Sequence, residues 1–283
     1  MKKKIVLPTD FSKNALNAIN YATELYKTTP CEFFILHSYY LPGSNKSNLL
    51  IPEPTEKKLN EVKERAEKNM EILKKQALFN EDHSKHTFHF LNEFGSFQKV
   101  LKKTIEKKDV DLILMGTLGE TDDKNTVFGS NAVNTMENIR NCPVIAIPNN
   151  IIFKNSNEIV FPTSFKINYK DNELATLIEV SKLMNAPIRI LYVKNNEEFS
   201  NEQIQNKILL NQILEATNFT HHQLFNMNMQ EGVRCFAQSR ESEMIAFVNK
   251  KHNFFGSVFS NPMVKDLGAN TNIPLLAMHN SKK

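Results

Sequence analysis

Long apolar runs and cysteines are scarce in this sequence of 283 residues. No apolar run approaches the roughly 18 residues that a membrane-spanning helix needs. Too few apolar residues separate the lysine-rich residues 1–4 from Pro8 for a signal peptide, so none is expected. The three cysteines, Cys31, Cys142 and Cys235, are too widely spaced for a disulfide framework or a metal knuckle. We therefore expect a cytoplasmic protein with reduced thiols and no membrane partner.

An excess of charge of one sign is also missing. Lys and Arg number 35 against 31 Asp and Glu, which gives a net charge of +4. The lysine-rich segments are mixed with glutamate, as in residues 56–58, and such runs are typical of solvated helix faces. This balance predicts no broad basic surface, so we expect no nucleic-acid partner. The hydrophobic content of 41% is that of a globular protein, and the length predicts two domains.

An internal repeat supports two domains. The segment IVLPTDFS at residues 5–12 reappears as IVFPTSF at residues 159–165, and NCPVIAI at 141–147 reappears as NIPLLAM at 272–278. The first pair is offset by 159 − 5 = 154 residues and the second by 274 − 143 = 131. Offsets of this size indicate a duplicated domain, because solenoid repeats are only about 20 to 50 residues long.

Each copy alternates short apolar runs with longer segments of helical period. This pattern is typical of a parallel sheet covered by helices on both faces. We expect strands in the first copy over residues 4–7, 33–39, 86–92, 111–115 and 144–147. We expect strands in the second copy over residues 158–161, 188–193, 223–227, 244–248 and 275–278. The predicted domains are residues 1–150 and 151–283.

A glycine-rich loop follows the fourth strand of the first copy. Gly116, Gly119 and Gly129 precede Ser130 at a helix start, where backbone N–H groups and the helix dipole favour an anion such as phosphate. Asp10 leaves the carboxyl end of the first strand, where a ligand crevice opens in such sheets. Together these residues predict a nucleotide site. Taken singly, the glycines are also explained as turn residues and Asp10 as a helix cap.

Several short motifs occur together in the first copy: PTDFS at residues 8–12, Leu36-His37, Gly95, DVDLILMG at 109–116, Gly-x2-Gly-x9-Gly-Ser and CPV at 142–144. In this combination the chain resembles the universal stress protein family, and the whole chain resembles its tandem members. The resemblance implies an α/β fold with two flavodoxin-like (Rossmann-like) domains. Each would be a five-stranded parallel sheet with helices on both faces. The fifth strands would pair the domains as an intramolecular pseudo-dimer.

The resemblance also implies an adenine nucleotide between the first and fourth strands: ATP, ADP or AMP, with or without Mg²⁺. Matched by position, its cofactor-binding residues are Pro8, Thr9, Asp10, Ser38, Met115, Gly116, Gly119, Gly129, Ser130, Asn131 and Ala132. Thr9 and Asp10 would meet the adenosine, Ser38 would face adenine, and the glycines would surround the phosphates. No pair of nucleophile and base stands out, so we expect no catalytic residue and at most slow ATP hydrolysis.

The second copy lacks these residues. Ser164 stands in the place of Asp10, and all three aligned glycine positions hold other residues, the third being Ser260. The pair Gly256-Ser257 is out of register. We therefore expect a degenerate second domain and one nucleotide per chain.

Three functions can be considered for these residues. The first is a stress-response binding or signalling module in which the nucleotide orders the glycine loop and residues 41–54 and so changes a surface that an unidentified protein partner recognises. The alternative is a stress protein that binds no nucleotide and acts only through protein contacts. It is favoured by Ser38, where the family usually has an aliphatic residue, and by Asp122 and Asp123 in the glycine loop. The third, an ATP-consuming enzyme of the pyrophosphatase-like group, requires a Ser-Gly-Gly-x-Asp-Ser loop that is missing after the first strand. Homodimerisation of the whole chain is left open.

Other candidate residues have ordinary structural interpretations. We interpret three histidines as surface residues rather than a metal site, with no carboxylate fixed beside them: His83, His86 and His89. Three phenylalanines are predicted to face the core: Phe88, Phe90 and Phe94. Cys142 is predicted to be a buried thiol.

Overall fold

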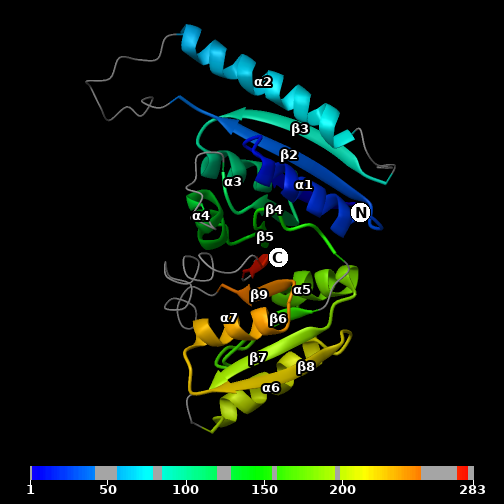
Figure 1. Cartoon of the computed structure of the whole chain (residues 1–283), viewed down its shortest axis with the longest axis vertical. Helices are drawn as coiled ribbons and strands as arrows, with labels where there is room; N and C mark the ends of the chain where they lie inside the picture. Colours follow the sequence, from blue (N-terminus) through cyan, green and yellow to red (C-terminus); the bar gives the residue numbers. More distant parts are fainter. Residues whose placement is uncertain are drawn as a thin grey trace, which may run out of the picture.

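The computed structural model describes residues 2–41, 56–78, 85–119, 129–154, 158–194, 198–249 and 273–279 (Figure 1). The first half contains β1 (Lys3–Pro8), α1 (Lys13–Leu25), β2 (Cys31–Tyr39), α2 (Glu56–Leu78), β3 (Thr87–Phe94), α3 (Phe97–Lys108), β4 (Leu112–Gly116), α4 (Ser130–Asn138) and β5 (Val144–Ile147). The second half contains β6 (Ile159–Pro162), α5 (Asp171–Met184), β7 (Ile188–Lys194), α6 (Asn201–Ile213), β8 (Phe219–Phe225), α7 (Met229–Ser239), β9 (Met244–Val248) and β10 (Leu275–Met278).

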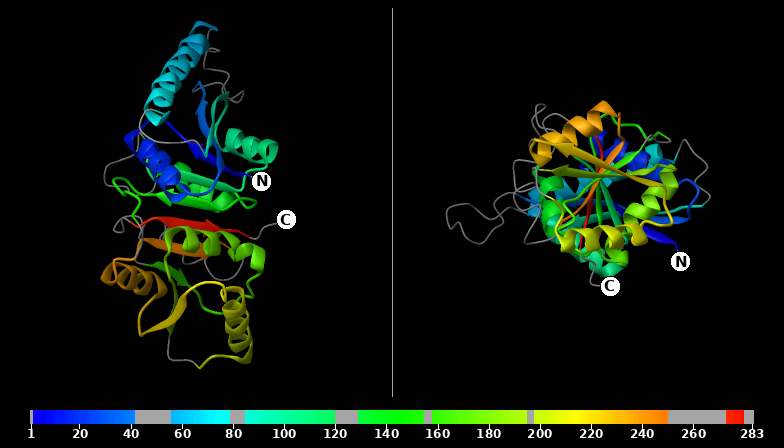
Figure 2. Two further views of the ribbon diagram at one scale, coloured as in Figure 1. Left: turned by 90° about the vertical axis from the view of Figure 1, so that its right-hand side faces the viewer. Right: turned by 90° about the horizontal axis from the view of Figure 1, so that it is seen from below.

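All these strands form one sheet in the order β3-β2-β1-β4-β5-β10-β9-β6-β7-β8. Neighbouring strands are parallel except at the centre, where β5 and β10 pair antiparallel with Ala146 opposite Leu275. The order 3-2-1-4-5 of the Rossmann-type sheet is thus present twice, joined through the fifth strands (Figure 2). The predicted α/β fold and internal pseudo-dimer are confirmed. The domain boundary at residue 150 stays a prediction.

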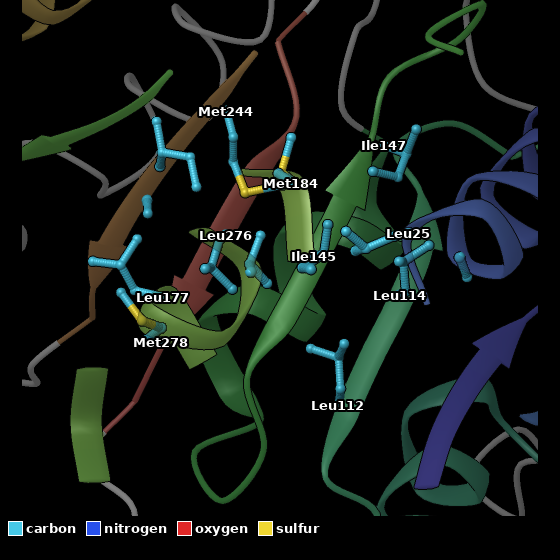
Figure 3. Close-up of a cluster of buried hydrophobic side chains, with 14 of the residues drawn as sticks. Leu25, Leu112, Leu114, Ile145, Ile147, Leu177, Met184, Met244, Leu276 and Met278 are labelled. Atoms are coloured by element: carbon cyan, nitrogen blue, oxygen red, sulfur yellow. The ribbon is translucent and has the colours of Figure 1, made fainter. Parts of the chain in front are cut away.

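Two apolar layers cover the sheet, because successive strand residues point to opposite faces. Ile5 and Leu7 belong to one buried cluster with residues of α1, α2, α5 and α6, whereas Val6 belongs to the other with residues of α3, α4 and α7. Figure 3 shows the first cluster at the seam, where Ile145 of β5 and Leu276 of β10 lie side by side. Each face therefore has a core that continues across both halves.

Most predicted strands are found within two residues of their expected ends. One prediction is wrong: the strand expected at 223–227 is Phe219–Phe225. Its start is polar because it is an edge strand, which needs no unbroken apolar run. It ends before Asn226, whose φ of 55° leaves the strand conformation. The prediction that Phe94 faces the core is also wrong, because Phe94 ends the edge strand β3 with 53% of its surface exposed.

None of the described helices combines the length and the apolar composition needed to cross a bilayer.

Side chains cap some of the described helix starts. Ser12 caps α1, since its hydroxyl oxygen accepts a hydrogen bond from the Ala15 N–H at 3.1 Å. Ser96 occupies the corresponding position before α3 without a side-chain cap bond. The α1 cap fixes the chain where it leaves β1, which is the edge at which the candidate site lies.

Candidate functional site

A cavity of about 350 Å³ opens at the carboxyl ends of β1, β2 and β4. It lies at the point where the strand order reverses between β1 and β4, the usual ligand crevice of an open α/β sheet. Its volume falls within the roughly 300–1,000 Å³ of small-molecule sites. The lining contains these residues: Pro8, Thr9, Asp10, Ala15, His37, Ser38, Tyr40, Gly95, Ser96, Phe97, Met115, Gly116, Thr117, Leu118, Gly119, Asn131 and Ala132.

Nine of the eleven predicted site residues line this cavity. The other two, Gly129 and Ser130, lie at the start of α4, with Gly129 buried and Ser130 exposed. The loop with Asp122 and Asp123 and the segment 42–54 lie outside the described residues. The geometry thus brings the predicted residues together at one edge of the sheet. Their role in binding stays a prediction.

The turn after β1 holds Asp10 at the cavity wall. The Asp10 carboxylate accepts a hydrogen bond from the Ser12 N–H at 3.0 Å, and the Thr9 hydroxyl accepts one from the Phe11 N–H at 3.0 Å. Phe11 has a φ of 67°, an uncommon left-handed conformation for a bulky side chain. Such strain persists only where surrounding contacts enforce it, and it is frequent at ligand sites.

His37 is a wall residue that the motif alone left without a role. Its Nδ1 lies 2.8 Å from the Thr9 carbonyl oxygen, which can only accept, so Nδ1 carries the proton. Its ring packs on Phe11 with the centroids 4.4 Å apart. Burial lowers the pKa of His37, although the Thr9 carbonyl and Asp10 act in the opposite direction. A neutral His37 therefore braces the strained turn.

Gly116 allows α1 to approach the end of β4. A Cβ at this position would lie 2.9 Å from the Asn14 Nδ2 and 3.1 Å from the Asn14 backbone oxygen. The Asn14 amide in turn donates to the Leu118 carbonyl at 3.2 Å. The absence of a side chain at Gly116 thus fixes the path of the first residues of the glycine loop.

The first turn of α4 forms the opposite wall through Asn131 and Ala132. Gly129 at the N-cap provides no side-chain cap, and its own N–H donates to the Thr117 carbonyl at 2.7 Å. The first N–H groups of a helix have no partner within the helix, and they carry the positive end of its dipole. This wall therefore suits an anionic group. Among the described lining residues there is no lysine or arginine.

Sequence reasoning missed part of the wall. The residues that no motif assigned to the site are Ala15, Tyr40, Ser96, Phe97, Thr117 and Leu118. Most directly follow a strand end or begin a helix, so the strand-order rule could have found them once the sheet edge was known. His37 and Gly95 belonged to the family motif but had no assigned role.

The second half repeats the turn after its first strand. The Thr163 hydroxyl accepts from the Phe165 N–H at 3.1 Å, and the Ser164 hydroxyl oxygen accepts from the Lys166 N–H at 3.2 Å. Phe165 has a φ of 57° and packs on Tyr192 as Phe11 packs on His37. Ser164 therefore takes the structural place of Asp10 without its carboxylate.

Bulky residues replace the cavity wall in the second half. The Thr9 N–H donates to Leu36 and the Thr163 N–H to Leu191, so Ser38 corresponds to Val193. At the ends of β4 and β9, Gly116 corresponds to Val248. Ser164 is only 3% exposed, and its carbonyl accepts from the Gln203 amide of α6 at 2.8 Å. The described residues thus support the predicted loss of the second site; residues 250–272, with the other glycine positions, lie outside them.

The remaining candidates are structural. The Glu32 carboxylate lies 3.4 Å from His89 Nε2, so the expectation that no carboxylate adjoins these histidines is wrong: the side-by-side strands β2 and β3 bring the two together. His83 lies outside the described residues. Cys142 is buried and donates weakly to the Val110 carbonyl at 3.6 Å, as predicted.

A second cavity, of about 220 Å³, lies on the seam between the halves. Lys3 of β1 and Glu179 of α5 form an ion pair at its wall. His279 after β10 is 5% exposed, and burial lowers its pKa to about 3, with Arg140 acting in the same direction. The ion pair between Lys3 and Glu179 joins the two halves at this cavity.

Comparison with known proteins identifies a matching family and solved structures of similar fold. Residues 1–148 match the model of the universal stress protein family. No curated protein sequence matches significantly. A universal stress protein from Archaeoglobus fulgidus DSM 4304 covers 99% of this chain over 97% of its own length, with 12% identity and a TM-score of 0.68. A protein of unknown function from Pseudomonas aeruginosa PAO1 covers 98% over 92% of its length, with 9% identity and a TM-score of 0.61. These likenesses show the fold of the whole chain.

Proposed function

Because the chain belongs to the universal stress protein family, which its first 148 residues match, we propose that its first half binds one adenine nucleotide in the cavity beside β1 and β4. The chain would act as a stress-response binding or signalling module. The nucleotide would be ATP, ADP or AMP, with Mg²⁺ where a triphosphate is bound.

One observation carries the proposal: a single cavity has a carboxylate at one wall and an uncapped helix start at the other. Asp10 can accept hydrogen bonds from ribose or adenine, and the first turn of α4 can receive a phosphate group. The missing side chain at Gly116 lets Asn14 of α1 pack against the start of the loop. With no lysine or arginine among the described lining residues, Mg²⁺ would help to offset the charge of a triphosphate.

The same lining argues for binding rather than catalysis. The protonated Nδ1 of His37 is occupied by the Thr9 carbonyl, and Asp10 is engaged by the Ser12 N–H and reserved for the nucleoside. The other ring nitrogen, Nε2, is the acceptor of this tautomer, but burial lowers the pKa of His37 and makes it a weaker base toward an attacking water. We propose that ATP hydrolysis is at most slow.

Calorimetric titration with ATP, ADP and AMP, with and without Mg²⁺, tests the proposal. The unmodified chain should bind one nucleotide per molecule, and mass spectrometry of the purified protein should detect any nucleotide that remains bound. Asp10→Ala combined with Gly129→Val should weaken binding at least tenfold, because it removes the carboxylate and crowds the helix start. Circular dichroism should show an unchanged fold.

Ser164→Ala provides the matched control, since Ser164 occupies the Asp10 position in the second half. It should leave affinity and stoichiometry unchanged. Absence of binding at millimolar ATP, with no gain in thermal stability, would overturn the proposal. That result would favour the alternative, a stress protein that acts only through protein contacts, which the polar Ser38 in the cavity wall supports.

A further inference from the structure

The strand β8 is an edge without the usual protection. It ends the sheet and pairs only with β7 among the described residues. Its sequence, FTHHQLF, contains no proline and no Lys, Arg, Asp or Glu, the residues that commonly prevent edge-to-edge pairing. Burial lowers the pKa of both His221 and His222, and nearby positively charged side chains act in the same direction. The opposite edge, β3, carries Glu93.

An apolar strip runs along the helix that adjoins this edge. Ile204 and Ile208 of α6 are 43% and 46% exposed, one helical turn apart. Asn211 lies on the same side of the helix, and its Oδ1 is 2.8 Å from His221 Nε2 of β8. The two isoleucines therefore flank the open strand, at the end of the molecule where Figure 1 shows α6 and β8.

The strand has a phenylalanine at each end, three residues to either side of His222. Antiparallel pairing centred there would place Phe225 of each copy opposite Phe219 of the other. Phe225 is 52% exposed, and Phe219 is partly buried. Aromatic pairs directly opposite each other stabilise antiparallel strands. The two phenylalanines thus complement those of a second copy of the strand.

The helices would also meet in this arrangement. A two-fold axis perpendicular to the sheet relates antiparallel neighbours and keeps each face on its own side. The same relation holds at the β5–β10 seam, where α1 and α5 cover one face of the sheet. Two α6 helices would therefore lie on one face across the axis, with their Ile204 and Ile208 strips toward each other.

We propose that β8 and the adjoining side of α6 pair two copies of this chain. The two β8 strands run antiparallel across His222, and each sheet continues into the other. The interface is isologous, so it closes after two copies. The internal β5–β10 seam leaves the β5 edge unavailable for this purpose.

Sedimentation velocity over a range of protein concentrations tests the interface. The unmodified chain should be dimeric, and Phe225→Lys and Ile208→Lys should each raise the dimer dissociation constant at least tenfold. Phe94→Lys and Ile72→Lys place the same charge on similarly exposed residues, 53% and 47%, in the first half. Both controls should leave the dimer intact. A monomer at every concentration would overturn the proposal and favour a strand from another protein as the occupant.

Cross-linking tests the register. In a Cys235→Ser background, which removes the exposed cysteine, His222→Cys should form an interchain disulfide under copper-phenanthroline oxidation. Residues directly opposite have Cα atoms about 4.5 to 5.5 Å apart, within disulfide range. Gln223→Cys is the control, because residue 223 would face residue 221 and should cross-link poorly. Equal cross-linking of both variants, or a dimer that ignores Phe225→Lys, would overturn the pairing.

Discussion

At the scale of single residues, polar and small residues fix contacts between distant segments that apolar packing alone does not specify. Glu158 at the start of the second half is buried and receives hydrogen bonds from Arg189, Arg240 and Ser242 at 2.7 to 2.9 Å. Gly116 gives α1 room to approach β4. In both cases one residue fixes how distant segments meet.

Replacing Glu158 should lower the free energy of unfolding. Burial raises its pKa, but the hydrogen bonds from Arg240, Arg189 and Ser242 outweigh this and lower the pKa to about 2. Glu158→Gln leaves two arginines without their counter-charge, so urea unfolding should show a loss of about 3 kcal/mol. Glu24→Gln, at a surface pair with Lys27, should cost less than about 1 kcal/mol.

The same carboxylate gives a pH dependence. The pKa of Glu158 is lower in the folded state than in the unfolded state. The ionised carboxylate therefore stabilises the fold at pH values above the unfolded-state pKa of about 4.5, and this contribution is lost as the pH falls toward 2. The stability difference between the unmodified chain and Glu158→Gln should therefore shrink from pH 5 to pH 3. A constant difference over this range would contradict the assignment.

Gly116→Ala should destabilise the fold and weaken nucleotide binding. The new Cβ would meet the Asn14 backbone oxygen at 3.1 Å, and backbone cannot move aside as a flexible side chain can. We expect a loss of about 1–3 kcal/mol in urea unfolding, as for other overpacked sites. Unchanged stability would show that α1 shifts freely, against the tight approach inferred here.

At the scale of elements, the two halves exchange a small and a larger residue between equivalent strand and helix positions. Ser38 and Val193 are equivalent strand positions, and Val100 and Gly232 are each the fourth residue of their helix, α3 and α7. The first half thus has the small residue on the strand, beside its cavity. The second half has it on the helix, where a Cβ would lie 2.9 Å from Val193.

Gly232→Val should therefore lower stability by about 1–3 kcal/mol through overpacking. Adding Val193→Ser should recover much of this loss, because the pair then repeats the Ser38 and Val100 combination. A double-mutant cycle in urea unfolding measures the coupling. Additive effects would mean that the two residues do not compete for the same space.

At the scale of the whole molecule, the seam makes the duplication one structure. Its apolar layers continue across β5 and β10, and Lys3 pairs with Glu179 from the other half. Such an arrangement predicts a single cooperative unfolding transition. The two halves should not melt independently.

Differential scanning calorimetry tests this cooperativity. Leu101→Ala in α3 and Leu174→Ala in α5 each open a cavity at a fully buried site in a different half. Each should cost about 2–5 kcal/mol and shift the one transition as a whole. Two transitions, with each variant moving only one, would contradict the prediction.

The sequence alone determined the duplicated α/β architecture, because the alternation of apolar runs with helical periods is local. It also predicted the unequal halves, since Asp10 and Ser164 can be read directly from aligned positions. Only the tertiary structure decided that His37 is neutral and braces the turn, that Val193 and Val248 replace the second cavity wall, and that β8 ends the sheet. These properties depend on contacts between residues far apart in the chain, and no local pattern records which segments will meet.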